Sequence, residues 1–152
     1  MNRYLLAVIA GFGAFIAIGL LSLTETNFND IVLIMAPFGA TTVLVFGVPD
    51  SPLAQAKNVI FGHLITAFIG ILFYIYVDVT PLTIALATGL GVTSMLVSKT
   101  THPPAGANPI LIMLSGQSWL FLVTPVLIGS IVIVLVGKGL QKLQSHYFKS
   151  EC

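Results

Sequence analysis

The chain has 152 residues, of which 57% are hydrophobic and only 7% are charged, whereas soluble domains carry about 25% charged residues. So few charges cannot cover the surface of a soluble domain, and the composition predicts a membrane protein. A formal net charge of +1 excludes the basic surface that nucleic-acid binding needs. The lone cysteine, Cys152, excludes an internal disulfide and a cysteine-based metal cluster.

Apolar segments alternate with short polar links along the chain. They cover residues 4–23, 31–48, 58–77, 82–98, 106–117 and 119–137. The first is too long for a signal peptide and has no small-residue cleavage site after it, so we expect a retained helix. Four segments are long enough to span a bilayer at about 1.5 Å per residue. The second is interrupted by proline and glycine and the fifth is short, so these two are predicted to cross as broken helices or to re-enter.

The distribution of charge favours six crossings with both termini in the cytoplasm. In that arrangement every lysine and arginine falls inside: Arg3, Lys57, Lys99, Lys138, Lys142 and Lys149. Re-entrant broken segments would move Lys57 and Lys99 outside, against the positive-inside bias. We therefore expect an integral protein of a bacterial inner membrane with one transmembrane domain, residues 1–137. Residues 138–152 form a basic cytoplasmic tail next to anionic lipid.

The two halves of the chain resemble each other. Residues 37–44 and 104–111 share the pattern P-x-G-A-polar, and the small residues of 7–13 align with those of 85–91. The predicted fold is an all-α membrane protein with two inverted helix–broken helix–helix repeats, about 4–77 and about 82–137. It has about six membrane segments, of which four are full spans and two are broken or re-entrant. Such repeats indicate a transporter site, although apolar membrane sequence also matches itself easily.

The two broken segments are the candidate site. We expect each to begin a half-helix whose N-terminus faces the other near the bilayer midplane, because proline suits the first helical turn. Two facing ends would present free N–H groups and about one positive charge, which suits a monovalent anion. Gly39 and Gly106 would allow a ligand or another backbone to approach closely. The alternative is that both segments are kinks that serve packing. The candidate substrate-binding residues are Pro37, Phe38, Gly39, Ala40, Thr41, Thr42, His63, Lys99, His102, Pro103, Pro104, Ala105, Gly106, Ala107 and Asn108.

Several of these polar residues have two interpretations. His102 could donate to the anion or take up a proton in anion–proton symport; otherwise it caps the helix near residue 98 or lies at the lipid headgroups. Lys99 could attract anions, or it is an anchor at the cytoplasmic surface. Asn108 and the threonines at 41 and 42 could cap the half-helices or contact substrate. His63 lies within a membrane segment and is expected to face the protein interior, either lining a pore or bonding between helices.

Other features predict packing and exclude catalysis. Gly62, Thr66 and Gly70 form a small-residue stripe that permits close helix packing, either inside one chain or in a homo-oligomer. Asp50, Ser51 and Pro52 are typical of a turn or helix cap. The sequence contains no zinc-protease, nucleophile-elbow or phosphate-loop motif, and no segment pairs two carboxylates, so we expect neither enzymatic activity nor a cofactor or metal.

The run His102-Pro103-Pro104-Ala105-Gly106-Ala107-Asn108 resembles the signature of the HPP family of integral membrane proteins. Phe38-Gly39-Ala40 and the stretch 48–63 also resemble that family, and the likeness covers about residues 4–137. Its members are usually described as having four membrane spans, and some are implicated in nitrite transport in cyanobacteria and plastids. The resemblance implies a transporter or channel for a small anion, with nitrite as the substrate. The alternative is a non-transporting membrane scaffold or a subunit of a larger complex.

Overall fold

The computed structural model describes residues 3–27 and 32–148, and every regular element in that part of the chain is helical. The elements in chain order are α1 (Arg3–Asn27), α2 (Ala36–Thr42), the π-helical turn η1 (Val43–Gly47), the 3₁₀ turn η2 (Pro52–Ala54), α3 (Ala56–Tyr76), α4 (Pro81–Val97), the 3₁₀ turn η3 (Pro103–Ala107), α5 (Asn108–Ser115), the π-helical turn η4 (Leu122–Leu127) and α6 (Ile128–Phe148). The predicted all-α fold is confirmed.

Three stretches of helix are long and apolar enough to cross a bilayer, namely Arg3–Thr26, Ala56–Tyr76 and Leu122–Ser145. Ala36–Gly47 and Pro81–Val97 are apolar but shorter. Large apolar side chains point outward, as Leu82 and Val97 do with exposed fractions of 77% and 78%. Lipid would cover such surfaces. Residues 138–148, predicted as part of a tail, continue the helix α6.

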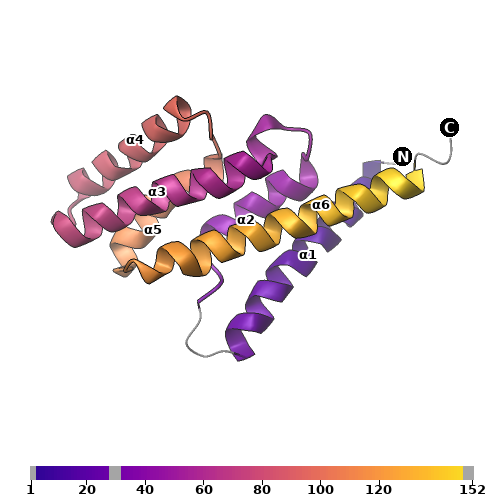
Figure 1. Cartoon of the computed structure of the whole chain (residues 1–152), viewed down its shortest axis with the longest axis horizontal. Helices are drawn as coiled ribbons and strands as arrows, with labels where there is room; N and C mark the ends of the chain where they lie inside the picture. The colour runs from indigo at the N-terminus through magenta and orange to yellow at the C-terminus, as the bar shows by residue number, and fades with distance from the viewer. Residues whose placement is uncertain (1–2, 28–31, 149–152) are drawn as a thin grey trace.

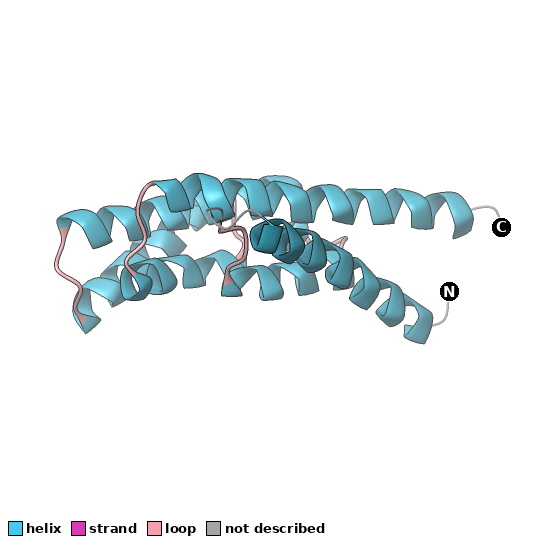
Figure 2. Cartoon of the chain, turned by 90° about the horizontal axis from the view of Figure 1, so that it is seen from below, coloured by secondary structure: helices cyan, strands magenta, loops and turns pink. Residues whose placement is uncertain are grey.

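The helices are arranged around the middle of an elongated molecule. Both chain termini lie at the same end (Figures 1 and 2). Helices α3 and α6 follow the long axis in opposite directions, and α2 and α5 start near the middle and extend toward opposite ends (Figure 1). The two short helices are therefore flanked by long ones that could span the apolar layer.

Local sequence explains where the short helices begin and end. Pro37 lies in the first turn of α2, where its missing N–H is not needed. Thr80 and Thr83 form a reciprocal capping box at the start of α4. Gly116 ends α5 in the left-handed conformation with φ 71°, which glycine adopts without strain. Ser51 caps η2 by accepting a hydrogen bond from the N–H of Leu53, as the sequence predicted for this turn.

The small-residue stripe of α3 is buried inside the chain. A Cβ added at Gly62 would lie 2.9 Å from the Cβ of His102, and one at Gly70 would lie 2.8 Å from the Cα of Pro109. Thr66 is fully buried between them. The stripe therefore packs the second half of the chain against α3, and an oligomer contact through these three residues is wrong because their surface is already covered.

Replacing Gly70 with alanine should destabilise the fold. The added methyl group would meet the backbone of Pro109, and overpacking of this kind costs about 1–3 kcal/mol. The matched control is Gly89→Ala in α4, where nothing lies within 4 Å of the added Cβ. We expect thermal unfolding in detergent, followed by circular dichroism, to show a lower midpoint for Gly70→Ala only. Equal midpoints would contradict the close packing of α3.

Candidate functional site

A chain of hydrogen bonds joins three separate segments in the interior of the bundle. The hydroxyl oxygen of Thr41 lies 2.8 Å from Nε2 of His63 and 3.0 Å from Nε2 of His102. Thr41 belongs to α2, His63 to α3, and His102 directly precedes η3. All three side chains are fully buried. One hydroxyl group therefore links both histidines that the sequence singled out.

The carbonyl group of Leu53 fixes the hydrogen on one of the rings. Nδ1 of His102 lies 2.8 Å from the carbonyl oxygen of Leu53, which can only accept. Nδ1 therefore carries the hydrogen, and Nε2 of the neutral ring is an acceptor. The single hydroxyl hydrogen of Thr41 is shared between this nitrogen, at 3.0 Å, and the carbonyl oxygen of Pro37, at 3.1 Å. Because His102 is buried and bonded in this way, it does not lie at the lipid headgroups and does not cap α4.

The other ring is fixed by Asn108. The amide nitrogen of Asn108 lies 3.1 Å from the carbonyl oxygen of His63 and 3.0 Å from the hydroxyl of Thr66. That hydroxyl donates to the carbonyl of Gly62, so it accepts from Asn108. An amide nitrogen can only donate, so Nδ1 of His63, which is 3.1 Å from the same nitrogen, carries no hydrogen, and Nε2 of the neutral ring carries it. The chain thus runs from His63 through Thr41 to His102.

Asn108 also carries a buried oxygen atom, Oδ1, that has no hydrogen-bond partner among the described residues. A buried polar atom without a partner costs about 1–3 kcal/mol. While His63 is neutral the amide keeps this orientation, because turning it over would place its oxygen against the carbonyl oxygen of His63. The free acceptor is therefore a built feature of the cluster.

The surroundings of the two rings hold no counter-charge. The ring centroids of His63 and His102 are 5.0 Å apart, and the edge of Phe38 meets His63 at 5.4 Å. Helices α2, α4 and α5 and the turns η2 and η3 contain no charged residue. Lys57, in the first turn of α3, is exposed, as is Lys99 in the link after α4. A proton on either ring would be an uncompensated positive charge.

Helix α2 packs against the turn η3 and does not meet the first turn of α5 tip to tip. Thr41 lies one turn after Pro37 in α2, and yet it is the residue that contacts His102. The expected facing N-termini need correction for this reason. Prolines 103 and 104 start a 3₁₀ turn, and α5 begins only at Asn108. These prolines also remove N–H donors, so a ligand here would depend on side chains for its hydrogen bonds.

The other predicted site residues divide between the outer side of the half-helices and the interior. Gly39 and Ala107 are exposed and Gly106 is half-buried, and a Cβ added at either glycine would meet nothing within 4 Å. The glycines therefore leave free space and do not serve close packing within the chain. Ala40 and Pro103 are exposed, whereas Pro37, Phe38, Pro104 and Ala105 are buried. The buried hydroxyl of Thr42 donates to the carbonyl of Gly39 at 2.7 Å.

Lys99 ends α4 in an unusual conformation. Its φ of 55° is left-handed, a region that favours glycine. The N–H groups of Lys99 and Thr100 bond the carbonyls of Leu96 and Met95, which completes a Schellman motif. The chain reverses here and enters the stretch that contains His102. The Lys99 side chain is exposed and is not part of the buried cluster.

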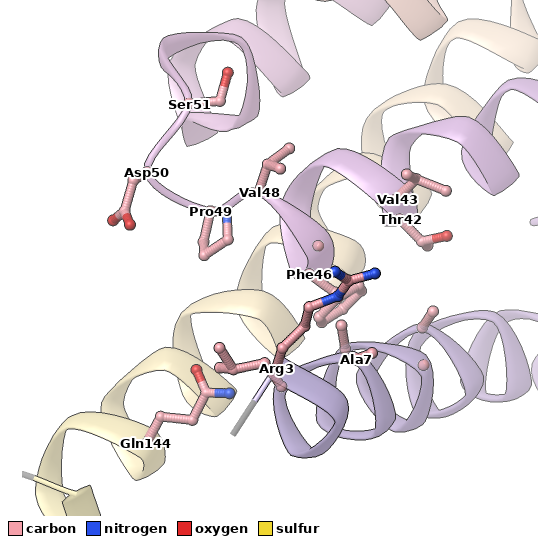
Figure 3. A pocket seen from close by; sticks show the side chains of 15 residues that line it. Arg3, Ala7, Thr42, Val43, Phe46, Val48, Pro49, Asp50, Ser51 and Gln144 are labelled. Atoms are coloured by element: carbon pink, nitrogen blue, oxygen red, sulfur yellow. The ribbon is translucent and has the colours of Figure 1, made fainter. Parts of the chain in front are cut away.

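A groove opens at the end of the molecule where the termini lie. It has a volume of about 800 Å³ and lies between α1, the α2–η1 segment and the link that follows it. Small residues of α1, including Ala7, Ala10 and Gly11, form one wall, and Thr42 and Phe46 lie opposite (Figure 3). Arg3 extends along the groove, and no carboxylate pairs with it among the residues that the structure describes (Figure 3).

Sequence reasoning did not identify every residue of the cluster. It missed the carbonyl of Leu53, the role of Thr66 toward Asn108, and Arg3 as a groove residue. A signal existed for Thr66, because its hydroxyl lies in a small-residue stripe that also borders a histidine. The backbone carbonyl of Leu53 left no trace in the sequence. No group of three metal-binding side chains occurs within residues 3–27 and 32–148.

Close contacts in one half of the chain are repeated in the other. A Cβ at Gly62 would lie 2.9 Å from the carbonyl oxygen of Thr100, and one at Gly129 would lie 3.2 Å from that of Leu33. Gly62 and Gly129 are 67 residues apart in the sequence, and so are Leu33 and Thr100. In the same register Gly70 packs on Ile112, and Gly137 packs on Val45. The corresponding glycines thus make corresponding contacts.

Comparison with known proteins places the chain among membrane proteins. The model of the HPP transmembrane region matches residues 2–148. Two transmembrane proteins of Dictyostelium discoideum are 31% and 30% identical over 137 residues, which is 85% of this chain. The chain spans 44% and 48% of the length of these relatives.

No solved structure matches the chain. The family match covers nearly the whole sequence, including both half-helices and the four side chains of the buried cluster, Thr41, His63, His102 and Asn108. The chain is an integral membrane protein and belongs to the HPP transmembrane family.

Proposed function

We propose that this protein is a transporter or channel for a small monovalent anion, with nitrite as the substrate suggested by the family resemblance. The observation that carries the proposal is the buried Thr41–His63–His102–Asn108 cluster, where α2 packs against the turn η3 that precedes α5. Polar side chains are costly inside a membrane protein and mark transport pathways. Discontinuous helices that start near the midplane are typical of transporter sites.

Two inverted repeats account for the internal correspondence. Residues 37–48 and 104–115 share the same pattern of buried and exposed positions, and differ only at Gly39, which is exposed, and Gly106, which is half-buried. The repeated glycine contacts and the opposite directions of α2 and α5 in Figure 1 support the same interpretation. In this scheme the chain has four full spans and two broken segments, and both termini are cytoplasmic.

The groove provides the approach to the site from the end that carries the termini. Thr42 lines the groove, and the preceding residue, Thr41, is hydrogen-bonded to both histidines. Arg3 places a positive charge in this approach, which attracts anions, and the carboxylate of Asp50 lines the same groove. Nothing lies within 4 Å of a Cβ added at Gly39 or Gly106, so these positions leave space beside the half-helices.

The energetics suit weak binding and release. A charge at the centre of a membrane costs about 3 kcal/mol or more. A hydrogen bond to a charged group contributes about 1.5–3 kcal/mol, so two or three such bonds offset that cost. The balance leaves an affinity low enough for the anion to leave again, as conduction requires.

Leucine at Gly39 or Gly106 should block transport without unfolding the protein. Both positions have free space beside them, so the larger side chain would fill the pathway and not the core. We expect nitrite uptake into proteoliposomes to fall to the level of empty liposomes, which set the baseline because nitrous acid crosses bare lipid. Gly89→Leu, at an open position on α4, is the matched control and should transport normally.

Normal uptake by both leucine variants would contradict this route. Failure of both variants to fold, with Gly89→Leu folded, would instead favour the packing role and the non-transporting scaffold. Size-exclusion chromatography and circular dichroism of the purified variants separate these outcomes.

Replacing Arg3 with glutamine should slow nitrite uptake in a way that depends on salt. The charge attracts anions only over about 10 Å at an ionic strength of 0.1 M. We expect a reduced initial rate at low ionic strength and no difference from the unmodified protein near 1 M, where the screening length is about 3 Å. A deficit of equal size at both ionic strengths would show that Arg3 acts through structure and not through long-range attraction.

A further inference from the structure

We infer that His63, Thr41 and His102 form a relay that takes up one proton with each anion, so that the proposed transport is an electroneutral proton–anion symport. The inference rests on the anion transport proposed above and adds its coupling ion. It starts from the direction of the hydrogen bonds, which the fixed partners at both ends determine.

The relay moves a proton from one ring to the other through a single hydroxyl. A proton that binds Nδ1 of His63 makes that ring a cation, which can release its Nε2 hydrogen to the hydroxyl oxygen of Thr41 over 2.8 Å. The hydroxyl passes its own hydrogen, which it shares with the carbonyl oxygen of Pro37 before the transfer, to Nε2 of His102 over 3.0 Å. Thr41 ends as it began, with its hydrogen bonds reversed. His63 is neutral with its hydrogen on Nδ1, and His102 carries the positive charge.

Asn108 has the one free group that the protonated state needs. When Nδ1 of His63 carries a hydrogen, the amide nitrogen of Asn108 can no longer donate to it. Turning the amide over brings Oδ1, which is buried and has no partner among the described residues, onto that hydrogen. The turn gives up the two bonds of the amide nitrogen, to the carbonyl of His63 and the hydroxyl of Thr66. The free acceptor, which is costly in the neutral state, becomes satisfied when the proton is present. Asn108 is thus a positioning residue for the protonated ring.

Among the described residues, no carboxylate lies beside the two histidine rings to balance a bound proton, so binding of the proton is coupled to binding of the anion. The elements that carry the cluster contribute no carboxylate, and their one charged residue, Lys57, is exposed. Helix α6, which packs against α3, adds the exposed lysines 138 and 142. Helix α1, which packs against α2, adds Arg3, which is exposed, and Glu25, whose carboxylate accepts from the N–H groups of Leu33 and Ile34. Lys99, in the link between α4 and η3, is exposed as well and also positive. A bound proton therefore creates a net positive charge in the interior, which a monovalent anion nearby neutralises. Each ion lowers the cost of the other, and the two cross together.

The test uses the full chain in liposomes loaded with a pH-sensitive dye, with the membrane potential clamped by valinomycin and potassium. An inward nitrite gradient should acidify the lumen faster than in empty liposomes, and the rate should not change with the clamped potential. Uptake that scales with potential, without acidification above the baseline, would overturn the relay but leave anion transport standing. No uptake above the baseline would overturn the proposed function itself.

Variants of Thr41 test the relay directly. Thr41→Val removes the hydroxyl and keeps the branched shape, and we expect nitrite uptake and acidification to fall together by about ten-fold or more. Thr41→Ser restores the hydroxyl and should recover both rates. The matched control is Thr88→Val in α4, because Thr88, like Thr41, bonds a carbonyl one turn earlier in its helix but contacts no histidine.

Unchanged rates and proton coupling in folded Thr41→Val would overturn the relay. If that variant does not fold, the serine variant and the dependence of uptake on potential decide the question. A serine variant that folds but stays inactive would also contradict the relay, because it retains the hydroxyl group.

Discussion

The hydroxyl group of Thr41 is the contact on which the interior of this protein depends. It bridges His63 on α3 and His102 before η3, and so connects α2 to the start of the second half of the chain. In an apolar bundle these groups have no water to replace a lost partner, so each must be satisfied within the protein. The chain meets this demand by orienting each ring. The carbonyl of Leu53 orients the ring of His102, and the amide of Asn108, bonded to the carbonyl of His63, orients the ring of His63. Among the buried side-chain polar atoms of the described residues, only Oδ1 of Asn108 has no hydrogen-bond partner.

Small residues make this arrangement possible by letting backbones approach. Gly62 allows His102 to lie directly against α3, and Gly70 admits the first turn of α5. The equivalent glycines of α6, Gly129 and Gly137, admit α2 and η1 in the same way. The histidines do not follow this correspondence, because serine stands at 130 and methionine at 35, the positions equivalent to 63 and 102. These glycine contacts therefore recur in both halves, whereas the two histidines occur on one side only.

Much of this could be predicted from the sequence because the constraints were local. Apolar length predicts the helices, proline predicts the breaks, and the cost of a polar side chain in a membrane predicts that His63 faces inward. The pairing of the two histidines through Thr41 could not be predicted, because it depends on the overlap of α2 with η3. The overlap in turn follows from a 3₁₀ turn that delays the start of α5 to Asn108. The small-residue stripe of α3 was visible, but periodicity alone does not tell a contact inside the chain from one between chains.

The most direct test of the account is the hydrogen position on each buried ring. Solid-state NMR of the protein in lipid with nitrogen-15 histidine, assigned by substituting one histidine at a time, distinguishes protonated from unprotonated ring nitrogens. Under alkaline conditions the account predicts hydrogen on Nε2 of His63 and on Nδ1 of His102, two different tautomers in one sample. The same tautomer on both rings would contradict the directed chain through Thr41, and with it the description of the site.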